Sequence, residues 1–388
     1  MSVAMRGNGA GHSPVDRARS FHGDKLRLAR LLAGLSLDEL GGLVTASRQF
    51  VHQLETGAKE PTDEMRDAIA AALAVTPAFF ATPAINPVRE EDCHFRRLAS
   101  APRGLVSQAV ARGTVLEALV DALERHVRMP TVNFPEEARA ASPDVIERIA
   151  ENARQHWGLG LDGPITSMMR VVENAGAVVV NFDDLTDRID ALSMARRRPI
   201  IVRSTAKIAG ARLRFDLAHE VAHLIMHQGI VTGDGVTEGE AHRFAGAFLI
   251  PRTAFAREFP RGRRTLDWNA LFAMKLRWKV SVRAIVRRAF DLGLIDAAQY
   301  RTANIQLVKT GQAKAERYDE RIAVEEPELL RAAISWLSDR NGIVLHRLLA
   351  NLGMAPALFA RLTGERMPTL PENVVQLGMA KDDHFGVD

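Results

Sequence analysis

The chain of 388 residues has little of what marks a secreted or membrane-bound protein. It contains a single cysteine, Cys93, so no disulfide can form within the chain, and this favours a reducing compartment. No apolar run approaches the roughly 20 residues that a membrane-spanning helix needs. The N-terminal segment also lacks the apolar core of a signal peptide. We therefore expect a cytoplasmic protein that has no membrane partner.

Other absences narrow the chemistry. The sequence has no P-loop, no dinucleotide-binding fingerprint and no internal repeat. A net charge of +4 is too small by itself to indicate nucleic-acid binding. Hydrophobic residues make up 47% and charged residues 25%, which is typical of a globular protein. The length predicts two or three domains.

What the sequence does contain is the pentapeptide His219-Glu-Val-Ala-His223 within a largely apolar segment. On a helix, residues four apart lie on one face, so the two histidines can bind one metal ion together. Glu220 lies on the same turn and can accept a proton from a metal-activated water. An exposed turn with two histidines would lack such apolar neighbours, which predict a buried helix. Because buried histidines and glutamate need a partner, we predict a Zn²⁺ site with His219 and His223 as ligands and Glu220 as the general base.

A catalytic Zn²⁺ takes a third protein ligand, which we expect from a second helix over residues 237–250. Glu240 lies on the same stripe as Phe244 and Phe248 and therefore points toward the core, where a carboxylate must bind something. We predict Glu240 as the third ligand, with Glu238 as the alternative if the register differs by half a turn.

Two further residues near the pentapeptide are candidates for a role. His227 continues the stripe of His219 and His223 and is a further, weaker candidate for the third ligand. It could instead orient water or product, or only end the helix. Together with Arg214 it is also a candidate for stabilising a developing oxyanion. Cys93 and His94 have no CxxC pattern or neighbouring histidine, so we expect ordinary packing there.

Two segments resemble the ImmA/IrrE family of zinc metallopeptidases, namely Phe215-Asp-Leu-Ala-His-Glu-x-x-His-Leu-x-x-His227 and Glu240-Ala-x-x-Phe-Ala-x-x-Phe-Leu-x-Pro251. The resemblance implies His219, His223 and Glu240 as zinc ligands and Glu220 as general base. It also implies cleavage of repressor proteins in stress responses or mobile elements. Ala222 stands where the family usually has glycine, and it is small enough for similar packing.

The N-terminal part predicts a run of short helices. Ser36-Leu-Asp-Glu39 is a capping box, and Ser47 is expected to cap a helix over residues 48–55. That helix presents four polar residues outward, and Arg and Gln can read guanine and adenine in the major groove. The predicted DNA-contacting residues are Arg48, Gln49, His52 and Gln53.

A plain helical bundle with a polar face would also fit these short helices. Residues 35–59 resemble the XRE-type helix-turn-helix family through Leu35-Ser-Leu-Asp-Glu-Leu and Ser47-Arg-Gln-Phe-Val-x-Gln-Leu-Glu-x-Gly57. The resemblance implies binding of double-stranded DNA.

The net charge of the N-terminal helices gives the predicted DNA binding limited support. Residues 24–80 carry six Lys/Arg against eight Asp/Glu, so a dimer or the arginines Arg17 and Arg19 would have to supply attraction to phosphates. Residues 251–288, in contrast, carry eleven Lys/Arg and two acids. Such a segment is either a solvated face or a surface for DNA or an acidic partner.

The expected architecture is multidomain and mainly α, with a small α+β domain whose strands cover residues 177–182, 189–194 and 199–203. We predict a disordered lead-in (1–23), an XRE-type helix-turn-helix domain (24–82), a helical bridging region (83–160), an ImmA/IrrE-like zincin peptidase domain (161–255), a helical C-terminal region with a basic face (256–375) and a disordered tail (376–388).

The predicted function is that of a homodimeric DNA-binding transcriptional regulator with zinc-dependent peptidase activity. Its protein substrate would be a repressor or the chain itself. The alternative is a DNA-binding repressor or antitoxin-like regulator whose peptidase-like domain acts as a sensor without proteolysis.

Overall fold

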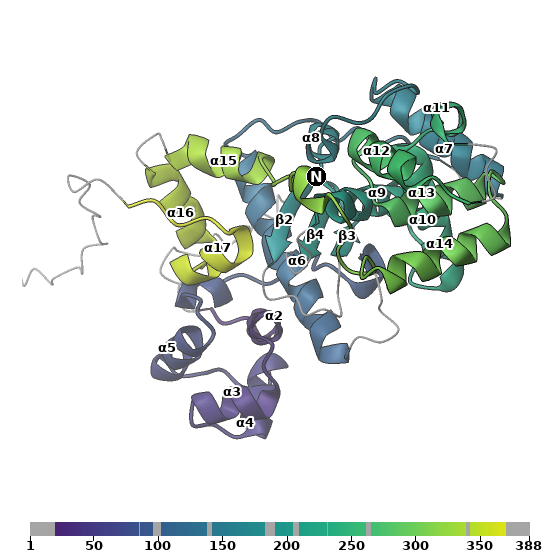
Figure 1. Ribbon diagram of the computed structural model, residues 1–388. Helices are drawn as coiled ribbons and strands as arrows, with labels where there is room; N and C mark the ends of the chain where they lie inside the picture. The colour runs from purple at the N-terminus through teal and green to yellow at the C-terminus, as the bar shows by residue number, and fades with distance from the viewer. Residues whose placement is uncertain are drawn as a thin grey trace, which may run out of the picture.

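The computed structural model describes residues 20–84, 86–95, 102–137, 142–182, 191–204, 209–230, 232–260, 265–338 and 342–369. These residues form a mainly helical protein with one small mixed sheet (Figure 1). The predicted tail 376–388 and nearly all of the predicted lead-in 1–23 lie outside the described residues, as do the first two residues of the predicted strand 189–194. None of the helices in the described part of the chain combines the length and the apolarity that a bilayer span requires.

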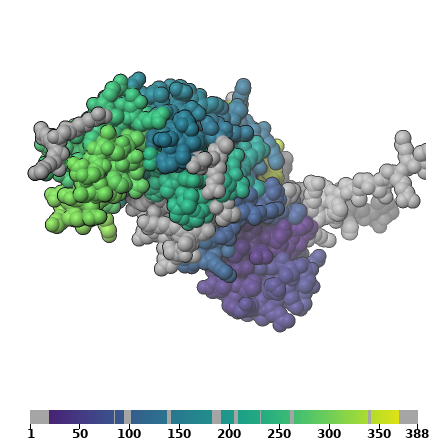
Figure 2. Space-filling model, turned by 90° about the vertical axis from the view of Figure 1, so that its right-hand side faces the viewer, coloured from purple at the N-terminus to yellow at the C-terminus, as the bar shows by residue number. Residues whose placement is uncertain are grey.

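The described residues begin with four short helices: α2 (Gly23–Ala33), α3 (Leu37–Leu43), α4 (Arg48–Glu55) and α5 (Asp63–Ala72). The predicted caps are present. Ser36 and Glu39 form a capping box, and the Ser47 side chain accepts a hydrogen bond from the backbone N–H of Phe50. A 3-10 turn, η1 (Pro77–Phe80), follows. Figure 2 shows these helices, in purple, gathered at one end of the molecule.

The sheet has the strand order β1-β3-β4-β2. Its strands are β1 (Cys93–Phe95), β2 (Val178–Phe182), β3 (Ala191–Met194) and β4 (Ile200–Ser204). Strand β2 runs parallel to β4, whereas β3 runs antiparallel to both β4 and β1. The last three strands follow the prediction, and β1 is an addition from the segment where only ordinary packing was expected. It follows the 3-10 turn η2 (Glu90–Asp92) and forms one edge of the sheet.

The two faces of the sheet belong to two different hydrophobic cores, because successive strand residues point to opposite sides. Val180, Leu192 and Val202 join a core with the N-terminal helices and four others. Those four are α6 (Arg103–Glu124), α15 (Leu329–Ser338), α16 (Ile343–Asn351) and α17 (Pro356–Thr363). The two cores are thus built from segments far apart in the sequence, with the sheet between them (Figure 1).

The opposite face, through Val179 and Ile201, packs against the second core. Its helices are α7 (Pro143–His156), α8 (Met168–Asn174), α9 (Gly210–Met226), α10 (Gly235–Leu249), α11 (Arg252–Glu258), α12 (Trp268–Trp278), α13 (Val282–Asp291) and α14 (Ala297–Lys309). Helices α12 and α13 lie in the predicted helical C-terminal region and are separated at Lys279, which adopts a left-handed backbone with φ of 54°.

The described cations of the basic segment 251–288 are mostly paired with acids, nearly all of which lie outside the segment. Among its described residues, Lys275 is fully buried and contacts Glu316 and Asp319 at 2.9 and 2.6 Å. Further pairs are Arg252–Glu151, Arg257–Asp162, Arg277–Glu258, Arg287–Asp291 and Arg288–Glu147. Much of the local positive charge therefore joins helices of the second core.

Candidate metal centre

Helix α9 carries the His-Glu-x-x-His pentapeptide through the middle of the second core. Its apolar residues pack on β3, α8 and α10, and the exposures of His219, Glu220 and His223 are 0, 1 and 2%. The burial that the apolar surroundings predict is thus present. Polar groups at this depth need partners, and each of the three has one.

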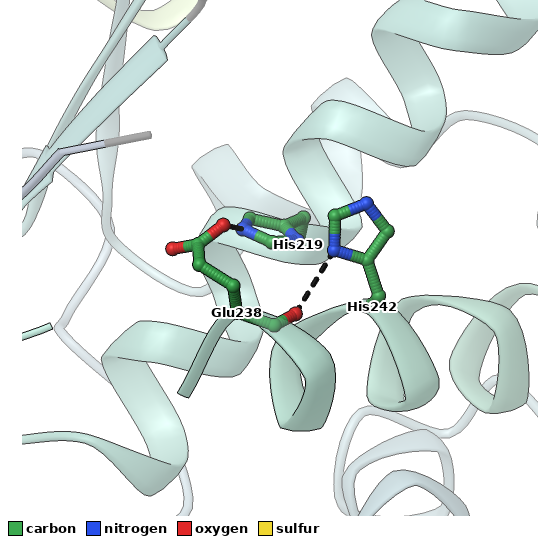
Figure 3. A group of neighbouring side chains, drawn as sticks. All are labelled: His219, Glu238 and His242. Carbon is green, nitrogen blue, oxygen red and sulfur yellow. Dashed lines mark hydrogen bonds and ion pairs between the residues drawn. The ribbon is translucent and has the colours of Figure 1, made fainter. Parts of the chain in front are cut away.

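Three donor groups converge where α9 meets α10. Nε2 of His219 and Nε2 of His223 are 3.1 Å apart. The carboxylate of Glu238 lies 3.3 Å from the first, through Oε2, and 3.5 Å from the second, through Oε1. Figure 3 shows Glu238 reaching from α10 to the His219 ring. Two imidazoles and one carboxylate are the donor set of a catalytic Zn²⁺ site, so the residues present fit the metal.

The carboxylate at this point is that of Glu238, the predicted alternative to Glu240. Glu240 instead lies 2.9 Å from Nε2 of His227. Helix α10 packs against both α7 and α9, so it has two inward faces. Phe248 packs against Trp157, beside α7, whereas Glu238 faces the α9 histidines. The apolar stripe of a helix shows which of its residues point inward, but it does not show which neighbouring helix they contact.

Glu240 nevertheless belongs to the centre, through a chain of hydrogen bonds. Nδ1 of His223 lies 2.9 Å from Nδ1 of His227, whose Nε2 meets Glu240. If Nε2 of His223 is bare to bind a metal, its Nδ1 carries the proton and donates to His227. His227 Nε2 then donates to the Glu240 carboxylate. Each atom of this relay has a consistent role, and such outer partners fix the orientation of a ligating imidazole.

His242 is a further donor that sequence reasoning missed. It lies one turn after Glu238 on α10, and its Nδ1 donates to the Glu238 carbonyl at 2.9 Å (Figure 3). In the neutral ring Nε2 is then the nitrogen with the lone pair. Donor atoms of His219, Glu238 and His242 lie within 4.8 Å of one another. The spacing of four residues between Glu238 and His242 was the available signal.

The electrostatics of the centre favour an ionised Glu238. Burial by itself raises the pKa of this carboxyl, but hydrogen bonds from His219 and His223 lower it well below its ordinary value. A negative carboxylate beside two imidazole nitrogens is the arrangement that a bound cation needs.

Glu220, the predicted general base, is held by a residue of β3. The Ser193 hydroxyl donates to Oε2 of Glu220 at 2.6 Å, and both side chains are buried. This contact places β3 directly beside the pentapeptide. Ser193 lies within the predicted strand 189–194, but its polarity alone gave no sign of a partner 27 residues away.

The other predicted residues lie elsewhere. Arg48, Gln49 and His52 are exposed on α4 and Gln53 is half-buried, whereas Val51 and Leu54 of the same helix are buried. Figure 1 shows α4 at the far end of the molecule from α10. Arg214 is buried and contacts Glu325 and the Ile165 carbonyl, so it holds a C-terminal segment on α9.

Comparison with known proteins gives one family. Residues 172–290 match the peptidase family described as the IrrE N-terminal-like domain. The matched part runs from α8 into α13 and contains β2–β4, α9 and α10. No curated protein matches the chain. The match points to a metallopeptidase-type function for this part of the chain and does not extend to the N-terminal helices.

Proposed function

We propose that the chain is a zinc-dependent peptidase that cleaves a regulatory protein, joined to a DNA-binding helical module. The observation that carries the peptidase proposal is the convergence of His219, His223 and Glu238 beside the buried Glu220. A Zn²⁺ ion at this point would supply a Lewis acid and bring the pKa of water close to 7.

Each residue then has a chemical role. His219, His223 and Glu238 hold the metal, and Glu240 orients His223 through His227. Glu220 accepts the proton of the attacking water and passes it to the leaving amine. The hydroxyl of Ser193 keeps the Glu220 carboxylate in place for this transfer. An extended peptide would be bound by strand addition at a sheet edge.

The DNA-binding part of the proposal rests on α4. Its exposed residues Arg48, Gln49 and His52, with Gln53, have the donors and acceptors that read base edges. The helices around it carry more acids than bases, so we propose a homodimer in which two α4 helices contact two half-sites. The substrate would be a repressor in a stress or mobile-element response, or a second copy of the chain.

The experiment that tests the peptidase compares new protein N-termini in host cells that express the wild type or Glu220→Gln. We expect both forms to bind one zinc per chain, because Glu220 is not a ligand. New N-termini should appear only with the wild type and would identify the substrate. Equal cleavage by both forms would refute the assigned role of Glu220.

A second candidate function is a repressor whose peptidase-like domain acts as a sensor without proteolysis. The ring of His94 stacks on His223, with ring centroids 5.1 Å apart. This contact favours the sensor function, because a residue of the chain itself covers the candidate metal centre. No difference in N-termini between the two forms, at rest and under stress, would favour this sensor.

A further inference from the structure

Strand β1 lies beside the strand that adjoins the candidate metal centre. It pairs antiparallel with β3, with Cys93 opposite Met194, His94 opposite Ser193 and Phe95 opposite Leu192. Ser193 is the residue that holds Glu220. The edge of β3 opposite β4 is therefore paired with a segment of the chain itself, and this segment comes from outside the family-matched region.

His94 brings this strand to the metal ligands. Directly opposite residues of an antiparallel pair point to the same face, so His94 faces α9 as Ser193 does. Its ring stacks on His223 at an interplanar angle of 11°, and its Nδ1 lies 3.0 Å from the Thr232 hydroxyl. The side chain is 2% exposed, and no partner among the described residues hydrogen-bonds its Nε2. A buried nitrogen without a partner is costly unless the site supplies one.

We propose that β1 occupies the position in which an extended substrate would pair with β3, so that the chain closes its own peptidase site until β1 leaves. The inference rests on the proposed peptidase function. Strand addition is a common way to hold extended peptides, and β1 uses the main-chain groups of β3 that such a peptide would need. His94 lies over His223, where a substrate side chain or carbonyl would otherwise enter.

One arginine fastens β1 to the sheet. Arg196, in the turn after β3, contacts Asp92 and Glu117, each at 3.1 Å, and donates to the Asn86 carbonyl at 2.8 Å. The Ala195 N–H also donates to the Asp92 carbonyl. These contacts join η2, α6 and the β3–β4 turn. Loss of Arg196 should therefore loosen β1 without touching the metal ligands.

Cys93 provides a direct measure of whether β1 has left. It is the only cysteine, it is 5% exposed, and burial raises the pKa of its thiol to about 12. A thiol reagent such as DTNB should react with the native chain only when β1 opens. We expect Arg196→Ala to raise the labelling rate about tenfold or more, which corresponds to ~1.4 kcal/mol of lost strand stability. Arg197→Ala, which removes a neighbouring arginine that pairs with Asp121 and Glu124, is the matched control and should leave the rate unchanged.

The decisive experiment adds a short extended peptide that ends in a hydroxamate, a zinc-directed probe, to the zinc-loaded wild type. If the probe and β1 compete, Cys93 labelling should rise with probe concentration and saturate as probe binding saturates. Probe binding, followed by fluorescence anisotropy, that leaves Cys93 labelling unchanged would overturn the inference.

A locked form tests the same point in the opposite direction. Met194→Cys places a second thiol directly opposite Cys93, within the range of a disulfide. The oxidised variant should bind the probe at least about tenfold more weakly than the reduced variant, and Met194→Ser, with a similar loss of volume but no thiol, should not respond to oxidation. Equal probe affinity of the reduced and the oxidised variant, when both bind zinc and the oxidised variant contains the disulfide, would overturn the inference about β1. It would leave the proposed peptidase function standing. Absence of bound zinc from every form would instead refute the proposed function, and the inference with it.

Discussion

At the scale of single residues, two glutamates of α10 only two positions apart have different partners. The Glu238 carboxylate contacts the Nε2 atoms of both His219 and His223, whereas the Glu240 carboxylate contacts His227. The first would be a metal ligand and the second an orienting group, although both carboxylates are mostly buried. This difference can be measured, because a ligand and an outer partner contribute unequally to metal affinity.

We predict that Glu240→Ala weakens zinc binding about 10–100-fold, the usual effect of losing an outer partner of a ligating histidine. Glu238→Ala should weaken it further, since it removes a donor atom of the metal. Competition with a chromogenic chelator at fixed pH measures both affinities. A larger loss for Glu240→Ala than for Glu238→Ala would make Glu240 the ligand.

At the scale of secondary-structure elements, features that depend on neighbouring residues could be predicted from the sequence, whereas pairing between distant segments could not. Ser36 and Ser47 cap α3 and α4 as expected because a cap needs only residues within one turn. Strand β1 has three residues, too few to show the alternation of apolar and polar residues that marks a strand. Its partner β3 lies about 100 residues further along the chain. The pentapeptide and its burial could also be predicted from residues near in sequence, because α9 has apolar residues on nearly every side.

The ligand from α10 could be predicted only as one of two residues. Whether Glu238 or Glu240 meets the histidines depends on how α10 rotates between α7 and α9, and that rotation is set by packing of Phe244 and Phe248 in the folded core. His242 and Ser193 were missed because a polar residue on an amphipathic element gives no sign of its partner in space.

Helix α4 carries a prediction of its own. The double variant Arg48→Ala with Gln49→Ala should abolish sequence-specific DNA binding and leave zinc content unchanged, because both side chains are exposed and distant from α9. Arg301→Ala with Gln306→Ala, which removes the same residue types from exposed positions of α14, is the control. Electrophoretic mobility shift with a selected operator measures the effect, and unchanged affinity would mean that α4 is not the reading helix.

At the scale of the whole molecule, buried ion pairs join helices that are distant in the sequence. Arg288 of α13 makes two hydrogen bonds to Glu147 of α7, and both side chains are 1 to 2% exposed. Breaking one half of such a pair leaves a buried charge without compensation, which costs about 3–5 kcal/mol.

We therefore predict that Glu147→Ala lowers the free energy of unfolding by about 3–5 kcal/mol in denaturant titrations. Glu151→Ala, one turn along α7, removes the partner of the more exposed Arg252 and should cost less than about 1 kcal/mol. Similar losses for the two variants would contradict the role given to burial.

The first core has a consequence for any cut that the peptidase would make in its own chain. The N-terminal helices pack on α6, the Thr76 N–H donates to the Gly353 carbonyl, and Val75 bridges to Met354 near the C-terminal helices. At Gly353 a Cβ would lie 2.1 Å from the backbone nitrogen of Phe79, so η1 is in close contact with the segment that joins α16 and α17. A chain severed between β1 and α6 would give two bands on a denaturing gel but one peak in gel filtration. Cleavage of this kind would therefore only permit dissociation of the two fragments. A second event that weakens the contacts between them would still be needed to separate them.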